Sequence, residues 1–293
     1  MLDTRCSILD ARCSILVTCK ANQDGYLSDD SQDWKLPPLL RFAKPLDLLR
    51  KKQRGKQNGG GWLLFRMAQV VITIDGPAGS GKSTAARLLA KRLGASFLDT
   101  GAMYRAVTLA AMEAGVDMND EKQLMEVLDK RKFGFRSEGD VMPAFIDGKD
   151  VTEKIRSPQV TANARYIASR PGLRERLVRM QRDFASNQKI IVTEGRDQGT
   201  VAFADADVKF FLTADLKERA RRRHIELKEK GISEDINKIE GDIRSRDESD
   251  EKRKVGPLKA ASDAIVIDTT KLNIEQVVGK LLKIVKQRCL KKG

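Results

Sequence analysis

The chain has 293 residues, of which 41% are hydrophobic and 33% are charged, and it carries a formal net charge of +14. This composition is typical of a globular protein and excludes an intrinsically disordered chain, and no apolar run is long enough to cross a membrane. The positive charge favours a polyanionic ligand, although charge alone does not distinguish nucleic acid from nucleotides.

The cysteines give little sign of a disulfide or a zinc site. Cys6, Cys13, Cys19 and Cys289 form no CxxC pair, and His224 is the only histidine. Free thiols are therefore the favoured interpretation. The first 20 residues also lack the continuous apolar core and the cleavage site of a signal peptide, so we expect a cytoplasmic protein.

Residues 1–66 differ in pattern from the rest of the chain. The segment Arg-Cys-Ser-Ile-Leu at 5–9 recurs at 12–16, and Pro- and Gly-containing linker-like sequence follows. An over-long start, with translation beginning at Met67, is favoured over a tail that binds RNA or a protein partner. We therefore expect residues 67–293 to form the folded domain.

From residue 70 onward, short apolar segments alternate with helical patterns. The expected strands are 70–74, 96–98, 189–193, 208–212 and 264–267. The expected helices are 82–93, 104–114, 173–185, 216–230 and 274–286. Strands that alternate with helices predict an α/β fold with a parallel five-stranded sheet flanked by helices.

One section interrupts this alternation. Residues 133–136 and 142–146 have the pattern of two strands, and Asp147-Gly148 is a turn sequence. We expect an inserted lobe with a small antiparallel sheet between the second helix and the third core strand, where it can hold a second substrate.

The clearest motif follows the first strand. Gly76-Pro77-Ala78-Gly79-Ser80-Gly81-Lys82-Ser83 completes the pattern G-x-x-x-x-G-K-[ST], and Thr84 continues into a helix. In this context the backbone N–H groups surround phosphates, the lysine reaches the β and γ phosphates, and the serine hydroxyl binds Mg²⁺. The motif predicts a P-loop NTPase fold that binds ATP and Mg²⁺, with Ser83 as a metal ligand.

Two further segments narrow the class of P-loop protein. The sequence Asn-Lys-Ile-Glu at 237–240 lacks the aspartate with which switch GTPases read guanine. The third core strand ends in Glu194-Gly195-Arg196-Asp197, unlike the Asp-Glu ending of motor ATPases. A kinase for a small molecule fits better, because five arginines are available to offset the charge of two phosphorylated substrates, although each could also be simply solvated. They are Arg105, Arg174, Arg196, Arg246 and Arg253.

The segments 71–84, 98–105 and 194–200 together resemble the bacterial cytidylate kinases, type 1 members of the nucleoside monophosphate kinases. Shorter matching segments lie at 155–158, 246–253, 257–258 and 261–268. The resemblance covers residues 67–293. It implies an inserted monophosphate-binding lobe at about 100–185, a helical lid at about 220–256, and ATP-dependent phosphorylation of CMP and dCMP to CDP and dCDP.

The resemblance also implies roles for individual residues. The implied ATP-binding residues are Gly76, Pro77, Ala78, Gly79, Ser80, Gly81, Lys82, Ser83, Thr84 and Arg222. The implied acceptor-binding residues are Thr100, Tyr104, Arg105, Arg174, Asp197, Arg246 and Asp250, of which Arg174 and Asp197 read the cytosine edge. The implied catalytic residues are Lys82, Arg196, Arg246 and Arg253.

One position departs from the family pattern. Arg165 stands where the family usually has a small serine near the base. We expect this side chain to point outward, because an arginine needs more room than a serine site provides.

Two alternatives stay open at this point. The chain could be a P-loop kinase for another small phosphorylated acceptor, or a nucleotide-sensing protein that binds RNA. For the favoured kinase we expect CMP or dCMP and ATP as substrates, Mg²⁺ as cofactor, no membrane or obligatory nucleic-acid partner, and a monomer.

Overall fold

The structure, a computed structural model, describes residues 70–138, 141–229 and 231–290. The chain divides into two units, Met1–Phe65 and Arg66–Gly293, and all described residues belong to the second. The expectations for residues 1–66, including the repeat and the start at Met67, lie outside the described residues.

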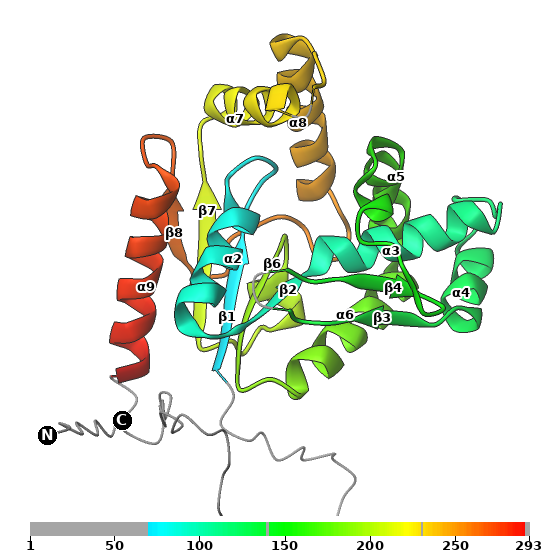
Figure 1. Ribbon diagram of the computed structural model, residues 1–293, viewed down its shortest axis with the longest axis horizontal. Helices are drawn as coiled ribbons and strands as arrows, with labels where there is room; N and C mark the ends of the chain where they lie inside the picture. Colours follow the sequence, from blue (N-terminus) through cyan, green and yellow to red (C-terminus); the bar gives the residue numbers. More distant parts are fainter. Residues whose placement is uncertain (1–69, 139–140, 230, 291–293) are drawn as a thin grey trace, which may run out of the picture. The chain divides into compact units, whose positions relative to one another are not determined.

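A five-stranded parallel sheet forms the core, in the order β2-β6-β1-β7-β8 (Figure 1). Its strands are β1 (Val70–Asp75), β2 (Ser96–Asp99), β6 (Ile190–Gly195), β7 (Val208–Thr213) and β8 (Ile265–Asp268). Ile72 in the central strand β1 lies between Val192 of β6 and Val208 of β7. The central strands are nearly continuous apolar runs because helices cover both faces of the sheet. All five expected strands are confirmed.

Eight α-helices accompany the strands in the described part of the chain. They are α2 (Lys82–Leu93), α3 (Thr100–Glu113), α4 (Glu121–Lys130), α5 (Pro158–Ser169), α6 (Pro171–Ser186), α7 (Leu216–Glu229), α8 (Ile236–Glu251) and α9 (Ile274–Leu290). Helices α2 and α9 pack side by side. None of these helices combines the length and the apolar character that a membrane crossing requires.

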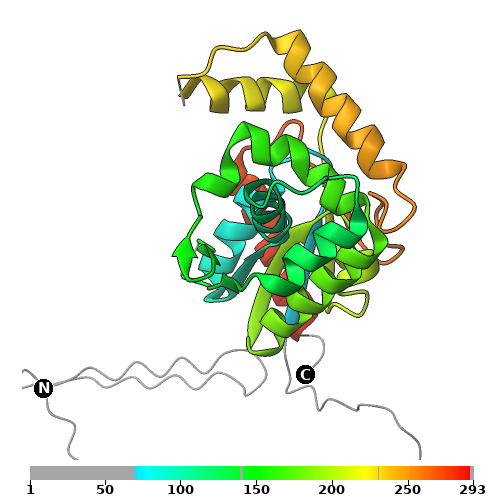
Figure 2. The same cartoon turned by 90° about the vertical axis from the view of Figure 1, so that its right-hand side faces the viewer.

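Helices α7 and α8 pack on each other beyond the end of the sheet (Figures 1 and 2). Their contact has a small hydrophobic core of its own, in which Leu227 of α7 meets Ile239 and Ile243 of α8. Ala78 of the phosphate loop completes this cluster. The helix pair therefore rests directly on the loop that follows β1.

The expected lobe lies between α3 and β6. It contains α4, a three-stranded antiparallel sheet, a 3₁₀ turn η2 (Lys154–Arg156), α5 and α6; its strands are β3 (Phe133–Phe135), β4 (Ala144–Ile146) and β5 (Lys149–Asp150). The predicted hairpin is confirmed. The third strand was missed because it is two exposed residues long, immediately after the tight turn at Asp147 and Gly148.

The helix expected at 104–114 begins four residues earlier, at Thr100. The side chain of Asp99 accepts a hydrogen bond from the N–H of Ala102 at 2.8 Å, which caps the helix. This cap lets Thr100 and Gly101 form the first helical turn, although neither is a strong helix former.

Candidate active site

The loop between β1 and α2 has a backbone conformation suited to binding an anion. Gly79 and Gly81 have φ values of 74° and 86°, which side chains with a Cβ rarely adopt. A Cβ on Gly76 would lie 2.1 Å from the carbonyl oxygen of Leu212. No side chain caps the start of α2. Its first N–H groups and the positive end of the helix dipole are therefore available to phosphate.

Lys82 is the first residue of α2, and its side chain is buried. Its ammonium group donates to the carbonyl oxygen of Pro77 at 3.0 Å. Burial, with the nearby guanidinium of Arg196, lowers the pKa of Lys82 to about 7. A phosphate beside this side chain would favour its charged form.

Ser83 donates its hydroxyl proton to Glu194 Oε1 at 2.9 Å. Glu194 is the next-to-last residue of strand β6, which pairs with β1. Burial, together with the neighbouring carboxylate of Asp99, raises the pKa of Glu194. A hydroxyl and a carboxylate oxygen are ligands that suit Mg²⁺, which usually takes phosphate oxygens as well. Within the described residues no group of three His, Cys, Asp or Glu side chains could hold a metal by itself. The pair therefore fits a metal ion that arrives with a nucleotide.

Glu194 was missed as a site residue. The signal that could have found it is its place at the carboxyl end of a strand beside the phosphate-loop strand, where ligands bind in parallel α/β sheets.

Thr100 and Arg105 of α3 lie on the other side of Glu194. The Thr100 hydroxyl donates to the backbone oxygen of Glu194 at 2.7 Å. Arg105 lies 3.2 Å from Asp99 Oδ2, and Arg156 lies 3.4 Å from the same oxygen. Asp99 thus holds two guanidinium groups near the end of β2. Sequence reasoning assigned no role to Arg156, although it belongs to the resembling segment 155–158.

Arg174 of α6 donates to Asp197 Oδ2, and both side chains are buried. The guanidinium carbon of Arg174 lies 5.6 Å from the ring centre of Tyr104. Burial raises the pKa of Tyr104 to about 12, so its phenol stays neutral. The structure therefore brings together the three residues assigned to the acceptor base and its pocket.

Asp250 of α8 accepts from two arginines, Arg196 through Nε at 2.7 Å and Arg253. Arg246 lies one helical turn before Asp250. Partial burial of its guanidinium and repulsion by Arg196 lower its pKa to about 10, although the residue as a whole keeps an exposed face. The structure thus places two of the predicted catalytic arginines, Arg196 and Arg253, on one carboxylate.

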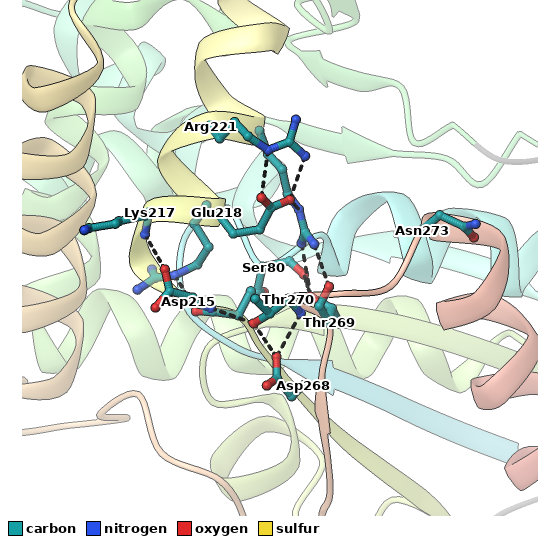
Figure 3. A network of polar contacts seen from close by, with 12 residues as sticks. Ser80, Asp215, Lys217, Glu218, Arg221, Asp268, Thr269, Thr270 and Asn273 are labelled. Carbon is teal, nitrogen blue, oxygen red and sulfur yellow. Dashed lines mark hydrogen bonds and ion pairs between the residues drawn. The ribbon is translucent and has the colours of Figure 1, made fainter.

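A cavity of about 290 Å³ adjoins the phosphate loop. It is bounded by Ser80 and Thr84 of the loop and α2, by Arg222 of α7, and by Thr269 and Val277 on the far side. Figure 3 shows the polar contacts around it. Arg222 donates to the backbone oxygen of Thr269 at 2.6 Å, and the Thr269 hydroxyl donates to the backbone oxygen of Ser80 at 3.2 Å.

Two residues that the sequence did not assign connect α7 and α8 to the phosphate loop. The N–H of Ala78 donates to Asp247 Oδ1 at 3.0 Å, and the carbonyl oxygen of Ala78 accepts from Arg219 at 3.0 Å. Arg219 also pairs with Asp247. Helices α7 and α8 therefore bind both the backbone N–H and the carbonyl oxygen of Ala78.

Arg165 is exposed and lies over the ring of Tyr166, with 5.1 Å between its guanidinium carbon and the ring centre. Its Nη2 is 3.4 Å from the Tyr166 hydroxyl. The side chain thus contacts its neighbour on α5.

A phosphate loop on a parallel sheet, an inserted lobe rich in arginine and a helix pair above the loop define a P-loop kinase. The family model described as cytidylate kinase matches residues 72–287. The chain belongs to the cytidylate kinase family.

Individual relatives agree with this assignment. A cytidylate kinase of Azotobacter vinelandii is 48% identical over 223 residues, which cover 75% of this chain and 97% of the relative. One from Lactobacillus gasseri is 43% identical over 217 residues, covering 74% of this chain and 94% of the relative. One from Caldicellulosiruptor saccharolyticus is 45% identical over 218 residues, which cover 74% of this chain and 96% of the relative.

Proposed function

We propose that this protein transfers the γ-phosphate of ATP to CMP and dCMP. The observation that carries the proposal is the buried pair of Arg174 and Asp197 beside Tyr104, in a chain that belongs to the cytidylate kinase family and holds a complete phosphate loop. Cytosine donates from N4 and accepts at N3, so a carboxylate and a guanidinium complement its edge. Asp197 uses Oδ2 in the ion pair, and its Oδ1 is the oxygen we assign to the cytosine amino group.

On the donor side, residues 76–84 surround the triphosphate and Lys82 contacts its β and γ groups. The adenosine occupies the cavity bounded by Arg222 and Thr269. The Ser83 hydroxyl and the Glu194 carboxylate, which lie 2.9 Å apart, would hold the magnesium ion that accompanies ATP. This ion, when bound, offsets part of the negative charge on the phosphate oxygens.

On the acceptor side, Arg105 and the Thr100 hydroxyl bind the phosphate of CMP, and Tyr104 lines the pocket. Arg246 and Asp250 contact the sugar. Asp250 already accepts from Arg196 and Arg253, so it also fixes the two guanidinium groups that flank the transferred phosphoryl group.

The chain needs no general base for this reaction, because the attacking oxygen belongs to a phosphate that is already ionised at neutral pH. Lys82, Arg196, Arg246 and Arg253 stabilise charge on the phosphoryl group during transfer. Helices α7 and α8 exclude water, which would otherwise compete with CMP as the acceptor.

Release of ADP in the presence of each nucleoside monophosphate tests the proposal. We expect turnover with CMP and dCMP, and at least about tenfold lower kcat/KM with UMP, because a site that hydrogen-bonds one base leaves its polar groups unpaired with another. Faster turnover with another acceptor would assign a different substrate. Salt-dependent RNA binding with no turnover would replace the kinase by a nucleotide-sensing RNA-binding protein.

We further expect the enzyme to act in the cytoplasm, as a monomer, without a nucleic-acid partner. Light scattering at assay concentrations with ATP and CMP present tests the oligomeric state. A mass that doubles on addition of substrate would contradict the monomer.

A further inference from the structure

Asp75 has no role in the reaction as described so far, yet it is buried between two parts of the site. It ends β1, one residue before the phosphate loop. Its Oδ1 accepts the N–H of Gln198 at 2.9 Å, and its Oδ2 accepts the N–H of Gly199 at 2.7 Å. Those two residues begin the π-helical turn η3 (Gln198–Ala202), directly after Arg196 and Asp197.

Both carboxylate oxygens of Asp75 are thus used as acceptors from two successive backbone N–H groups. Such bonds to an ionised group in a buried place are shorter and stronger than neutral ones. Only the ionised carboxyl group accepts at both oxygens without presenting a proton to a donor. The charged groups that face Asp75 are Asp197, whose charge disfavours ionisation, and Arg196, whose charge favours it.

The turn also fits closely against β1. A Cβ added to Gly199 would lie 3.0 Å from the Thr73 hydroxyl, 3.2 Å from Lys209 Cδ and 3.4 Å from Asp75 Oδ2. The side chain of Gln198 is fixed separately, because its Oε1 accepts from the Thr193 hydroxyl at 2.9 Å. The turn therefore has one defined position relative to the strand that leads into the phosphate loop.

We propose that Asp75 is a positioning residue for phosphoryl transfer: by holding the turn after β6 it sets the spacing between the phosphate loop and the pair Arg196 and Asp197. Arg196 acts on the transferred phosphoryl group, and Asp197 reads the acceptor base. Asp75 contacts neither substrate and acts through these two side chains. This inference rests on the proposed CMP kinase activity.

The Asp75→Asn variant tests the proposal. Asparagine keeps one acceptor oxygen and turns an NH₂ group toward the second N–H, so one of the two bonds is lost. We expect kcat with CMP to fall about 10- to 100-fold, since a displacement of about 1 Å can have an effect of that size. We also expect the preference for CMP over UMP to decrease, while the KM for ATP stays within about threefold because the phosphate loop itself is unchanged.

The chain supplies a matched control that contacts the same strand, in Asp207 directly before β7. Asp207 Oδ2 accepts the N–H of Val71 at 2.9 Å, near the opposite end of β1. Asp207→Asn makes the same chemical change to a carboxylate that accepts from a backbone N–H, but away from the turn. It should leave kcat and the preference for CMP over UMP within about twofold of wild type.

A second variant reaches the same turn without changing any charge. Gly199→Ala introduces the close contacts described above and should give the same pattern of lost kcat and lost base preference. Gly279→Ala in α9 is its control, because an added Cβ there meets nothing within 4 Å. If Asp75→Asn fails to fold, Gly199→Ala decides the question.

The thermal midpoint, the active-site concentration and both KM values are measured for every variant. A purely structural role would lower the midpoint and the active fraction, but the active molecules would keep wild-type kcat and base preference, and that result would overturn the proposal. A wild-type protein that does not phosphorylate CMP would instead refute the proposed function, so the two failures are separable.

Discussion

Arg174 and Asp197 form an ion pair that solvent hardly reaches, with 3% of Arg174 and 4% of Asp197 exposed. The two residues come from different elements, α6 and the turn after β6. Burial makes the pair costly to break, because the partner that remains is left as an uncompensated charge. The same burial makes the pair selective, since a base that does not complement it leaves buried polar groups unsatisfied.

Replacement of Asp197 should therefore change both base selection and stability. In Asp197→Asn we expect kcat/KM to fall far more for CMP than for UMP, because the carboxylate accepts from the cytosine amino group and repels the uracil carbonyl. Competition between the two acceptors measures the ratio. Asp129→Asn is the control, because Asp129 of α4 pairs on the exposed surface with Arg176, which lies on α6 as Arg174 does. An equal loss with both acceptors would move Asp197 to the phosphate or metal machinery.

Lys82→Ala should separate function from stability. Burial lowers the pKa of Lys82 to about 7, so the charged ammonium opposes folding at and below neutral pH, and that cost disappears as the pH rises toward 10.5. We expect turnover to fall at least about 100-fold. At pH 7, calorimetry without nucleotides should show a thermal midpoint no lower than that of wild type. Near-normal kcat in a folded variant would contradict the assignment of the phosphate loop.

Arg165→Ser should have little effect. The Arg165 side chain is exposed and lies over Tyr166 of its own helix. We expect the KM for CMP to change less than threefold. A shift of tenfold would correspond to about 1.4 kcal/mol of binding and would place Arg165 in the base pocket.

The pH dependence of stability should show the raised pKa of Asp75. Burial raises this pKa from 3.8 to about 7, so the fold favours the protonated carboxyl group. The resulting contribution to the free energy of unfolding is fully present below about pH 4 and is lost as the pH rises through about 7. At about 1.4 kcal/mol per pKa unit the loss is on the order of 2–4 kcal/mol. Activity should change in the opposite direction, because the ionised form holds the turn.

Urea titrations at pH 5 and pH 8 measure this effect. The difference in stability between the two pH values should be larger in wild type than in Asp75→Asn, which has no proton to lose. Asp207→Asn should behave as wild type does. Equal pH differences in wild type and Asp75→Asn would show that Asp75 titrates normally.

A chain that begins at Met67 should keep full activity. The family model matches residues 72–287, and about three quarters of this chain covers nearly the whole length of its relatives. We expect kcat and both KM values within about twofold of the full chain. A clear loss of activity, or a thermal midpoint several degrees lower, would give residues 1–66 a role in the folded protein.

The sheet was predictable because its central strands β1, β6 and β7 are buried along most of their length and therefore stand out as apolar runs. The phosphate loop was predictable because its glycines, lysine and serine are required by local backbone geometry. Strand β5 was not predictable, since it has two exposed residues and depends on pairing with β4. The early start of α3 depends on the cap that Asp99 provides, and the same carboxylate also pairs with Arg105.

Three other site residues could not be predicted for a different reason. Glu194, Asp247 and Arg219 act through contacts with residues that are 28 to 169 positions away in the chain. No local pattern specifies such contacts. The pairing of Asp250 with Arg196, 54 positions away, was likewise not predictable from the sequence, although both residues were among those implied by the family resemblance.

The lowered pKa values of Lys82 and Arg246 have a consequence for the lifetime of the fold. Burial is the main cause of both shifts, and repulsion by the neighbouring guanidinium of Arg196 adds to it, so the charged forms oppose the packed state. Phosphates that bind among them remove this repulsion and add their own binding energy to the stability of the protein. A ligand at 100 times its Kd contributes about 2.7 kcal/mol in this way. The resistance of this kinase to unfolding and proteolysis is therefore set in part by the nucleotide concentration around it, so that a shortage of its substrates also shortens its survival.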